Sequence, residues 1–540
     1  MALVSDEVKE LALPSRRWTP FSGLPPVVVW APAVLVACAV ALPLLYLLIR
    51  TVGVGEELPD MLFRWRTARV LLRSAALVAG VTAGAVAIAV PLAWITVRTD
   101  VPLRRMWSVA TVLPLVIPSY VAAFLAVVAL GPKGMLQGLL EPLGVSRLPE
   151  IYGYPGAAIT LALLTYPYVL LSVRSALVRL DPALEETSRS LGVSRWETFR
   201  RVVLPLLRPS IAGGALLVAL YTLSDFGAVS ILRYETFTWA IYIQYEGALD
   251  RTLAAALSLV LIAVALAILV GEGWVRGRAQ YYRSTAGAVR PPAVVRLGRW
   301  KWPALAFLSI VVGVSVVLPM GVLGYWVARG IAAGEVLQFL WRDAMNSVYV
   351  SAAAALAAVA AALPVAGLVV RHQGRMSAVV EKVTYTGFAL PGIVVALALV
   401  FFGIHYLTPL YQTVAMLMFA YVVLFLPTAV NTLRASLLQV SPSVEEAGRG
   451  LGKSPLGVMV TVTLPLLRPG LAAGAAMVFL LAMKELPATL ILSPTGFSTL
   501  ATSVWSATSE ALFARAAVPA LLLIMATAFP LIWLLRRGER

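Results

Sequence analysis

The chain has 540 residues, of which 60% are hydrophobic and 13% are charged. Soluble domains contain about 45–50% apolar and about 25% charged residues, so this composition excludes an ordinary water-soluble fold and indicates a protein embedded in lipid. The net charge of +17 would suit a nucleic-acid partner. The basic residues, however, stand in short segments between apolar runs, as the positive-inside rule describes, and we expect no nucleic-acid binding.

The N-terminal region and the single cysteine narrow the class further. Residues 1–26 are mixed in charge and contain prolines, and the apolar run that follows is long enough to span a bilayer. We therefore do not expect a cleavable signal. Cys38 is the only cysteine, so the chain cannot form an internal disulfide.

Twelve apolar runs are long enough to cross the hydrocarbon core, which takes about 20 residues of helix. The first six lie near residues 27–49, 70–97, 106–130, 156–178, 210–232 and 252–275. The second six lie near residues 304–328, 344–370, 378–403, 411–435, 470–492 and 512–536. The sequence predicts an all-α polytopic membrane protein with about twelve transmembrane helices.

Lysine and arginine predict the orientation in the membrane. The segment between the two sets of runs contains no acidic residue and these basic ones: Arg276, Arg278, Arg283, Arg290, Arg296, Arg299 and Lys301. Such a segment is expected in the cytoplasm, and an even number of crossings then places both termini there. The first outer loop fits less well, because it contains Arg64, Arg66 and Arg69.

The two sets of six runs are copies of each other. Between residues 181 and 209, 14 of 29 positions match their partners at 441–469, a shift of 260. The earlier runs match at a shift of 273, as these pairs show: Ser74 with Ser347, Pro91 with Pro364, and Pro118 with Pro391. Repeats are common in transporters, where the pathway lies at the repeat interface. The alternative is a structural duplication without transport.

A short pattern occurs between the fourth and fifth runs of each set. It reads EETSRSLG from residue 185 and EEAGRGLG from residue 445, followed in each copy by nine residues and then by VVLPLLRP or VTLPLLRP. Proline and acids suit a first helical turn, and the last glycine can end the helix in a left-handed conformation. The pattern predicts two short surface helices on the cytoplasmic side, which are equal docking sites for a two-fold symmetric partner.

This pattern resembles the EAA loop in permeases of binding-protein-dependent ABC importers, which reads E-A-A-x-x-x-G, nine residues, I-x-L-P. Glu186 and Gly192 match it in the first copy, where threonine and serine replace the alanines. Glu446 and Gly452 match it in the second copy, where glycine replaces the second alanine. Valine stands for the isoleucine in both copies, and the leucine-proline pairs match.

The resemblance implies the type I ABC importer permease fold, built from two parallel six-helix repeats. Residues 27–275 and 304–540 are then two permease domains, preceded by a cytoplasmic segment at 1–26 and joined by a cytoplasmic linker at 276–303. The implied partners are two copies of a cytoplasmic ABC ATPase and an extracytoplasmic substrate-binding protein, at a bacterial inner membrane. The residues implied in coupling to the ATPase are Glu185, Glu186, Gly192, Glu445, Glu446 and Gly452.

The sequence supports no catalytic site. Gly452, Lys453 and Ser454 look like the end of a phosphate-binding loop, but the first glycine of that motif would be residue 447, which is alanine. The two histidines fall on opposite predicted sides, so no H-E-x-x-H site exists. We expect no enzyme activity, no cofactor and no metal site, with ATP hydrolysis in a separate subunit. A secondary transporter, which needs no docking loop, is the alternative of another class.

Two acids occupy equivalent positions inside apolar runs. Asp225 lies in the fifth run, and Glu485, preceded by Lys484, lies at a shift of 260 in the eleventh. Charges inside spans are costly and usually functional, so these residues are candidates for a translocation pathway that attracts a cation. In the alternative, Lys484 and Glu485 pair locally and Asp225 caps a helix break.

The segment from residue 484 to 502 also bears on the substrate. Its stretches KELPAT, PTGF and TLAT are similar to the corresponding segment of ferric-iron importer permeases, which also fuse two permease domains. This resemblance implies ferric iron as the cargo, moved by alternating access. Thiamine importers share the fusion, and polyamine, sulfate and phosphonate permeases are related, so another small solute is the alternative.

Overall fold

The computed structural model describes residues 27–52, 64–132, 134–247, 251–276, 294–334, 340–372 and 374–538. Within these ranges the chain is helical, and the β-structure consists of one isolated bridge between Thr99 and Val295. The predicted N-terminal segment at 1–26 and residues 277–293 of the predicted linker lie outside the described residues.

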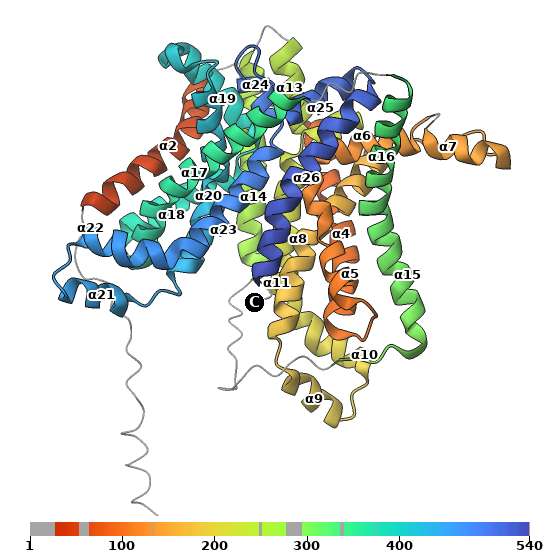
Figure 1. Cartoon of the computed structure of the whole chain (residues 1–540), viewed down its shortest axis with the longest axis horizontal. Coiled ribbons are helices and arrows are strands. Elements are labelled where there is room, and N and C mark those ends of the chain that lie inside the picture. The colour runs from red at the N-terminus through yellow and green to blue at the C-terminus, as the bar shows by residue number, and fades with distance from the viewer. Residues whose placement is uncertain are drawn as a thin grey trace, which may run out of the picture.

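The first repeat contains the helices that Figure 1 shows from red to yellow-green. In chain order they are α2 (Val27–Val52), α4 (Trp65–Arg98), α5 (Arg104–Ala110), η1 (Leu113–Val116), α6 (Ser119–Leu130), α7 (Met135–Leu140), η2 (Glu141–Leu143), α8 (Tyr154–Arg179), α9 (Pro182–Ser190), α10 (Arg195–Thr198), η3 (Phe199–Val203), α11 (Leu204–Ser224), α12 (Gly227–Ile231), α13 (Phe237–Gly247) and α14 (Arg251–Arg276).

The second repeat follows in the same order, from green to blue in Figure 1. Its helices are η4 (Gly298–Trp300), α15 (Lys301–Val312), η5 (Gly313–Val317), α16 (Leu318–Ala332), α17 (Trp341–Arg371), α18 (Arg375–Tyr385), η6 (Thr386–Ala389), α19 (Gly392–Tyr406), η7 (Thr408–Leu410), α20 (Val414–Leu437), α21 (Pro442–Gly450), α22 (Pro455–Val458), η8 (Met459–Thr463), α23 (Leu464–Met483), α24 (Pro487–Leu492), α25 (Leu500–Ser509) and α26 (Phe513–Gly538).

The prediction of a polytopic α-helical membrane protein is confirmed. Among the described residues, eleven helical segments are long and apolar enough to cross a membrane, and a shorter apolar helix at Gly392–Tyr406 marks the remaining predicted span. That span differs from the expected continuous helix. It is divided into α18 and α19 by a 3₁₀ turn that ends just before Pro391, because proline lacks the N–H that a helix interior needs.

Prolines also explain three wider turns in the long helices. The π-helical turns η3, η5 and η8 each end two residues before a proline, which is Pro205, Pro319 or Pro465. A proline ring clashes with the carbonyl of the preceding turn, and one extra residue per turn relieves that clash. The two copies of the docking pattern therefore enter their membrane helices, α11 and α23, through the same widened turn.

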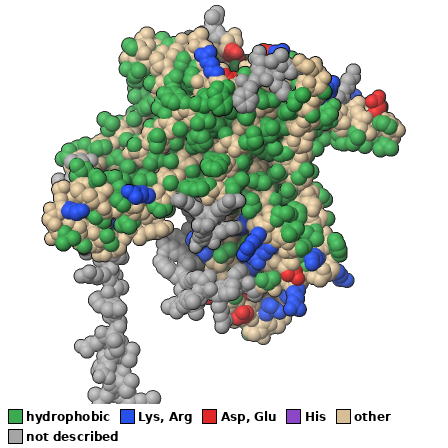
Figure 2. Space-filling model, in the orientation of Figure 1, with side chains coloured by type: hydrophobic (Ala, Val, Ile, Leu, Met, Phe, Trp, Pro, Cys, Tyr) green, Lys and Arg blue, Asp and Glu red, His purple; other side chains and the backbone are tan. Residues whose placement is uncertain are grey.

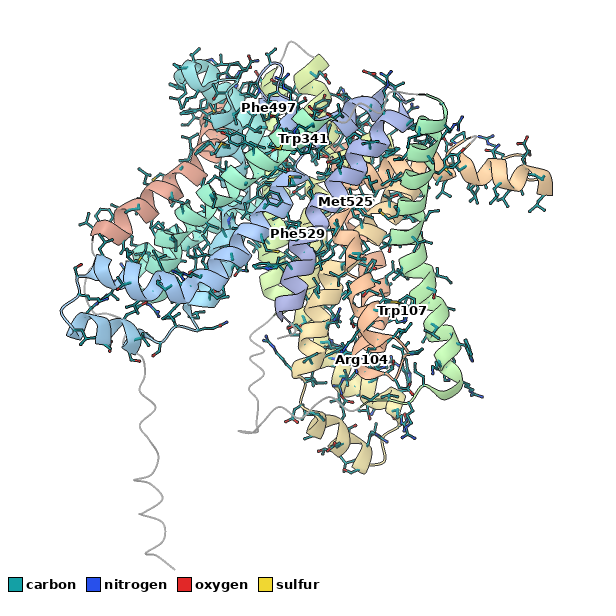
Figure 3. The ribbon with its side chains drawn as sticks, in the orientation of Figure 1. Arg104, Trp107, Trp341, Phe497, Met525 and Phe529 are labelled. Atoms are coloured by element: carbon teal, nitrogen blue, oxygen red, sulfur yellow. The ribbon has the colours of Figure 1, made fainter. Side chains whose placement is uncertain are left out.

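The middle of the molecule presents apolar side chains to its surroundings, as Figure 2 shows. Leu35, Ile310, Leu356 and Phe529 are 64–75% exposed, although each lies within a membrane-spanning helix. Figure 3 shows Met525 and Phe529 projecting from α26. Contact with lipid removes the cost that water would impose on such a surface, so this belt is the face toward the acyl chains.

The first helix of each repeat packs against the other repeat. Figure 1 shows α2 beside α17, α18 and α19 of the second repeat. The Tyr46 hydroxyl of α2 donates to the Phe401 carbonyl at 3.3 Å, and the Arg50 guanidinium lies 4.2 Å from the Phe401 ring centroid. These contacts attach α2 to a helix that lies about 350 residues later in the chain.

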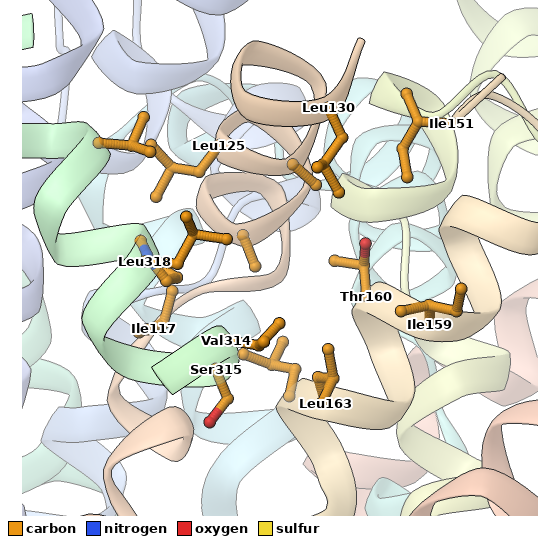
Figure 4. Close-up of a pocket in the computed structure, with 15 residues that line it drawn as sticks. Ile117, Leu125, Leu130, Ile151, Ile159, Thr160, Leu163, Val314, Ser315 and Leu318 are labelled. Atoms are coloured by element: carbon orange, nitrogen blue, oxygen red, sulfur yellow. The ribbon is translucent and has the colours of Figure 1, made fainter. Parts of the chain in front are cut away.

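The corresponding helix of the second repeat, α15–η5–α16, lies beside the first repeat. It contacts α6. The Trp326 ring of α16 packs edge-on against Phe513 of α26 at 5.6 Å, and Phe513 in turn stacks on Phe124 of α6 at 6.0 Å. Between α6, α8 and α16 lies a small apolar cavity of about 90 Å³, which Figure 4 shows. Ile117, Leu125 and Leu318 are among its lining residues. Its walls carry few polar groups, so it belongs to the packing between repeats rather than to a pathway for ions.

We predict that the two halves, expressed as separate chains cut between residues 277 and 293, copurify from detergent. The exchanged helices give each half a large contact with the other, so the covalent linker is not needed to hold them. Retention of the second half by an affinity tag on the first is the measurement. Tyr46→Ala should lower retention, whereas Leu35→Ala, at a lipid-facing position of the same helix, should not. Separate elution of the halves would contradict this division into 27–275 and 304–540.

Candidate coupling and translocation sites

The two predicted docking helices are present as α9 and α21. The Asp181 carboxylate caps α9 by accepting from the Ala183 N–H at 3.0 Å. Gly192 and Gly452 follow the helices with φ of +83° and +81°, the left-handed conformation that glycine adopts without a steric penalty. The local sequence therefore dictates the end of each helix and, through Asp181, the start of α9, whereas Ser441 makes no capping bond at the start of α21.

Each docking helix is tied to the end of a long membrane helix by a largely buried ion pair. Arg98 of α4 contacts Glu185 of α9 at 2.7 Å, and the Arg98 side chain is only 1% exposed. Arg371 of α17 contacts Glu445 of α21 at 3.0 Å in the same way. The sequence analysis did not single out either arginine as a partner of a docking helix. The signal was available, because Arg98 and Arg371 match at the shift of 273 and the two glutamates match at 260.

The outward faces of the docking loops carry both charge and exposed apolar groups. Glu186, Arg189, Gly192 and Arg195 line a shallow groove in the first loop. Leu191 and Leu451, which are equivalent, are 78% and 83% exposed beside these polar groups. Figure 2 shows Lys and Arg side chains around the first docking loop, which marks this side as polar rather than lipid-facing. An exposed leucine there is typical of an anchor for a protein partner.

The acids in the fifth and eleventh spans both lie at breaks in their helices. Asp225 follows α11, and its carboxylate accepts from the N–H groups of Ala228 at 2.9 Å and Val229 at 3.4 Å. Glu485 follows α23, and its carboxylate accepts from the Ala488 N–H at 3.2 Å. The expected continuous spans at 210–232 and 470–492 are thus interrupted. Each acid thus caps the start of the short helix that follows, α12 or α24, from the position just before the N-cap residue, Phe226 or Leu486.

The side chain of Glu485 is longer than that of Asp225, and the residue that faces each acid differs in size to match. The Ser119 side chain of α6 lies near the Asp225 carboxylate. The residue equivalent to Ser119 is Gly392, and a methyl group placed there would lie 2.3 Å from the Glu485 carboxylate. The longer glutamate therefore fills the space that serine occupies in the first repeat. The two acids also interact electrostatically with each other across the repeat interface.

Lys484 makes a contact that has no counterpart in the first repeat, where the equivalent residue is Ser224. Its ammonium donates to the Leu115 carbonyl at 3.0 Å, across the repeat interface. The Thr527 hydroxyl of α26 donates to the next carbonyl, that of Val116, at 3.1 Å. Side chains of the second repeat thus satisfy backbone acceptors of the first, where the 3₁₀ turn η1 breaks its third span.

The centre of the molecule brings all three predicted pathway residues together. Asp225 is only 7% exposed, and the adjacent Phe226 ring packs against Trp505 of α25 with centroids 5.2 Å apart. The capping bonds agree with the structural alternative for Asp225 and leave its role in transport a prediction. Across the part of the chain that the structure describes, no group of three or more His, Cys, Asp or Glu side chains lies close enough to hold a metal ion.

Two stretches of the chain, one in each repeat, match a known protein family. The family model described as "Binding-protein-dependent transport system inner membrane component" matches residues 85–278 and, a second time, residues 356–537. The chain belongs to this family. It is a permease component of an importer that works with a binding protein, and the double match confirms the two repeats. This family is consistent with the expectation, from the sequence, of a pore-forming subunit.

Three relatives show how far the likeness extends. The chain is 37% identical over 509 residues, 93% of its length and 97% of the relative's, to the Fe(3+)-transport system permease protein FbpB 2 of Haemophilus influenzae. It is 27% identical to the ferric transport system permease protein FbpB of Actinobacillus pleuropneumoniae, over 71% of this chain and 59% of that one. It is 31% identical to the molybdenum transport system permease protein ModB of Escherichia coli, over 36% of this chain and 86% of that one.

We predict that Asp225→Asn leaves the thermal stability of the permease nearly unchanged, whereas Asp225→Ala lowers it by about 1 kcal/mol, the usual value of an N-cap. Asparagine keeps an oxygen that can accept from Ala228, and alanine does not. Thermal unfolding of the purified protein in detergent is the measurement. Equal destabilisation by both substitutions would mean that the charge, rather than the capping bond, holds α12 in place.

Proposed function

We propose that this chain is the permease subunit of an ATP-driven importer of ferric iron. The observation that carries the proposal is the likeness to the Haemophilus influenzae Fe(3+)-transport permease, because it runs through both repeats in a single alignment. The molybdenum permease, by comparison, matches about one third of the chain, the extent of a single repeat. A likeness that includes the fusion of the two domains supports the same cargo class.

The charges at the centre support a cationic cargo. Asp225 and Glu485 face the repeat interface from both sides, where a transporter of this architecture holds its pathway. Lys484 offsets one of the two negative charges, and the one that remains attracts a cation and repels an oxyanion such as sulfate or molybdate. Their shared position therefore favours iron over the anions that more distant relatives carry, with Asp225, Lys484 and Glu485 as the pathway residues.

The docking loops are proposed to couple the permease to ATP hydrolysis by a separate subunit. Equal loops call for equal partners, so the complex contains two copies of a cytoplasmic ATPase, one on each loop. Leu191 and Leu451 insert into the ATPase surface, and Glu186 and Glu446 contribute polar contacts around them. The basic segment near Arg296 and Arg299 lies on the same side, against the end of α4. This supports our proposal that the docking face and both termini are in the cytoplasm of a bacterial cell.

The proposed cycle is alternating access. Figure 1 shows α9 and α21 apart on the docking side. On the opposite side the repeats meet, because α13 contacts α19 and α25 contacts α6. This arrangement corresponds to a resting state that is closed toward the substrate-binding protein. ATP binding draws the ATPase subunits and their loops together, the opposite ends separate to accept iron, and hydrolysis restores the resting state.

Ferric-iron uptake by the reconstituted complex tests the proposal. We expect ATP-dependent accumulation of radiolabelled ferric iron in vesicles that contain this permease, its co-encoded ATPase and its binding protein. Thiamine, a polyamine and molybdate, each with the same complex, serve as competing cargoes. Uptake of one of these instead of iron would overturn the proposed cargo, and uptake without ATPase would overturn the class. Among folded variants, Asp225→Asn should lower iron uptake if the carboxylate contributes to the pathway, and full uptake would remove it from that role.

We predict that the double substitution Gly192→Val and Gly452→Val abolishes most ATPase stimulation while the protein still inserts in the membrane. A side chain at a left-handed position costs about 1–2 kcal/mol, and the docking helix shifts to relieve this cost. ATPase activity with and without loaded binding protein is the measurement. Gly321→Val is the matched control, because Gly321 has an open surrounding and ordinary helical backbone. Normal stimulation in the double variant would contradict a coupling role for these loops.

A further inference from the structure

The helices α4 and α17 are equivalent members of the two repeats, and each stays helical along its whole length despite one internal proline, Pro91 or Pro364. They contain 34 and 31 residues, respectively. At about 1.5 Å per residue, such helices measure roughly 50 Å, enough to reach from one face of a membrane to the other. The helices that continue directly from the docking loops, α11 and α23, instead break at Asp225 and Lys484. An interrupted helix transmits displacement poorly, so α4 and α17 are better suited than α11 and α23 to transmit displacement across the membrane.

The inner end of each continuous helix holds a docking helix. The buried pairs Arg98–Glu185 and Arg371–Glu445, at 2.7 and 3.0 Å, make this connection. Arg371 also donates to the Val440 carbonyl at 3.0 Å, and the Thr463 hydroxyl donates to Glu445 at 3.2 Å. A buried charge that loses its partner is strongly destabilised, so the docking helix and the membrane helix are held to move together.

The outer end of each continuous helix holds the start of another helix, through a serine that both repeats share. The Ser74 hydroxyl of α4 accepts from the N–H of Phe237, the first residue of α13, at 3.2 Å. The Ser347 hydroxyl of α17 accepts from the N–H of Leu500, the first residue of α25, at 2.8 Å. A first-turn N–H has no partner within its own helix. These buried serines therefore cap α13 and α25 from a neighbouring helix.

Charged groups strengthen the same outer contacts in a different way in each repeat. In the first, Arg73 of α4 pairs with Glu235, two residues before α13, at 3.1 Å. In the second, the Asp343 carboxylate of α17 accepts from the hydroxyls of Ser498 and Ser503, which flank the start of α25. Figure 3 shows Trp341 and Phe497 together at this end, far from Arg104 at the docking end of α4. Both repeats therefore hold the outer end of the long helix against the next helix, the first by an ion pair and the second by hydrogen bonds to a carboxylate.

We propose that α4 and α17 are rods that transmit movement between the docking helices and the outer segments before α13 and α25, with Arg98, Arg371, Ser74 and Ser347 as positioning residues at their ends. This inference rests on the proposed coupling to an ATPase. The rods move with the docking loops, and their outer serines carry α13 and α25 away from the repeat interface. In the reverse direction, a binding protein that docks on the outer segments reaches the ATPase through the same rods.

A double-mutant cycle on the complete complex tests this inference. One pair of substitutions, Ser74→Ala and Ser347→Ala, releases the outer ends, and another, Arg98→Met and Arg371→Met, releases the inner ends. Each pair should lower the stimulation of ATPase by loaded binding protein about fivefold or more, the lower range of allosteric coupling. If both ends act through the same rod, releasing the second end adds little to releasing the first. The quadruple variant should therefore keep as much ATPase stimulation as the more impaired of the two double variants. Losses of thermal stability should add, because the ends are about 24 residues, or roughly 36 Å, apart.

Matched controls lie on the same two helices. The Ser351 hydroxyl, one turn beyond Ser347, is buried and has no hydrogen-bond partner among the described residues, so Ser351→Ala should keep full stimulation. The Thr96 hydroxyl near Arg98 bonds only carbonyls of its own helix in the structure, and Thr96→Val should also keep it. Ser74→Thr with Ser347→Thr restores a hydroxyl and should recover stimulation. If the arginine variants fail to fold, Glu185→Gln with Glu445→Gln replaces them in the cycle.

A second measurement separates this inference from the proposed function. A spin label at Phe497→Cys, in a Cys38→Ala background, reports movement of the outer segment when ATP binds, without any cargo. We expect an ATP-dependent change of its spectrum that is lost when Arg98 and Arg371 are replaced. Absence of ATPase binding to the unmodified permease would overturn the proposed function. Two outcomes would overturn the role of the rods while leaving the proposed function intact. In one, the wild type is stimulated but the losses of stimulation in the two double variants multiply in the quadruple variant. In the other, the arginine substitutions leave the label response unchanged.

Discussion

Hydrocarbon offers no hydrogen bonds to a peptide group, and the interior of this protein depends on that constraint. Among the described residues, three interrupted membrane helices have side chains that compensate for the intrahelical bonds lost at the break. Asp225 and Glu485 accept from the backbone N–H groups of Ala228 and Ala488. Lys484 and Thr527 donate to the backbone carbonyls of Leu115 and Val116. The polar residues that would make a pathway are thus also the residues that make the breaks possible. Structure and transport draw on the same groups, so only substitutions that separate charge from capping can distinguish the two roles.

The repeats have stayed alike where a symmetric partner would touch them and have diverged where the cargo would pass. The docking helices, their glycines and their buried ion pairs match one for one. At the centre, Ser119 with Asp225 is replaced by Gly392 with Glu485, and Lys484 has no counterpart. A pair of identical ATPase subunits requires equal surfaces. A single small cargo requires one set of contacts, which either repeat can supply.

Exchange of the first helices limits how the halves can move. Because α2 packs against α17 and α19, and α16 packs against α6, a rotation of one half displaces a helix of the other. The halves therefore move as interlocked bodies and cannot drift apart during a cycle. The rods α4 and α17 lie inside this frame. They connect the two faces of the membrane while the exchanged helices hold the bundle together.

The sequence by itself determined the membrane class, the number of spans, the repeat and the docking helices, because apolar length and signals such as Gly192 act locally. It also brought Asp225 and Glu485 to equivalent positions and left their capping role open. Only the tertiary structure decided that Arg98 meets Glu185, that Ser74 caps a helix 163 residues away, and that the first helices are exchanged. The reason is physical. Lipid and protein interior are almost equally apolar, so an apolar run long enough to span the membrane carries little information about which helix it will pack against.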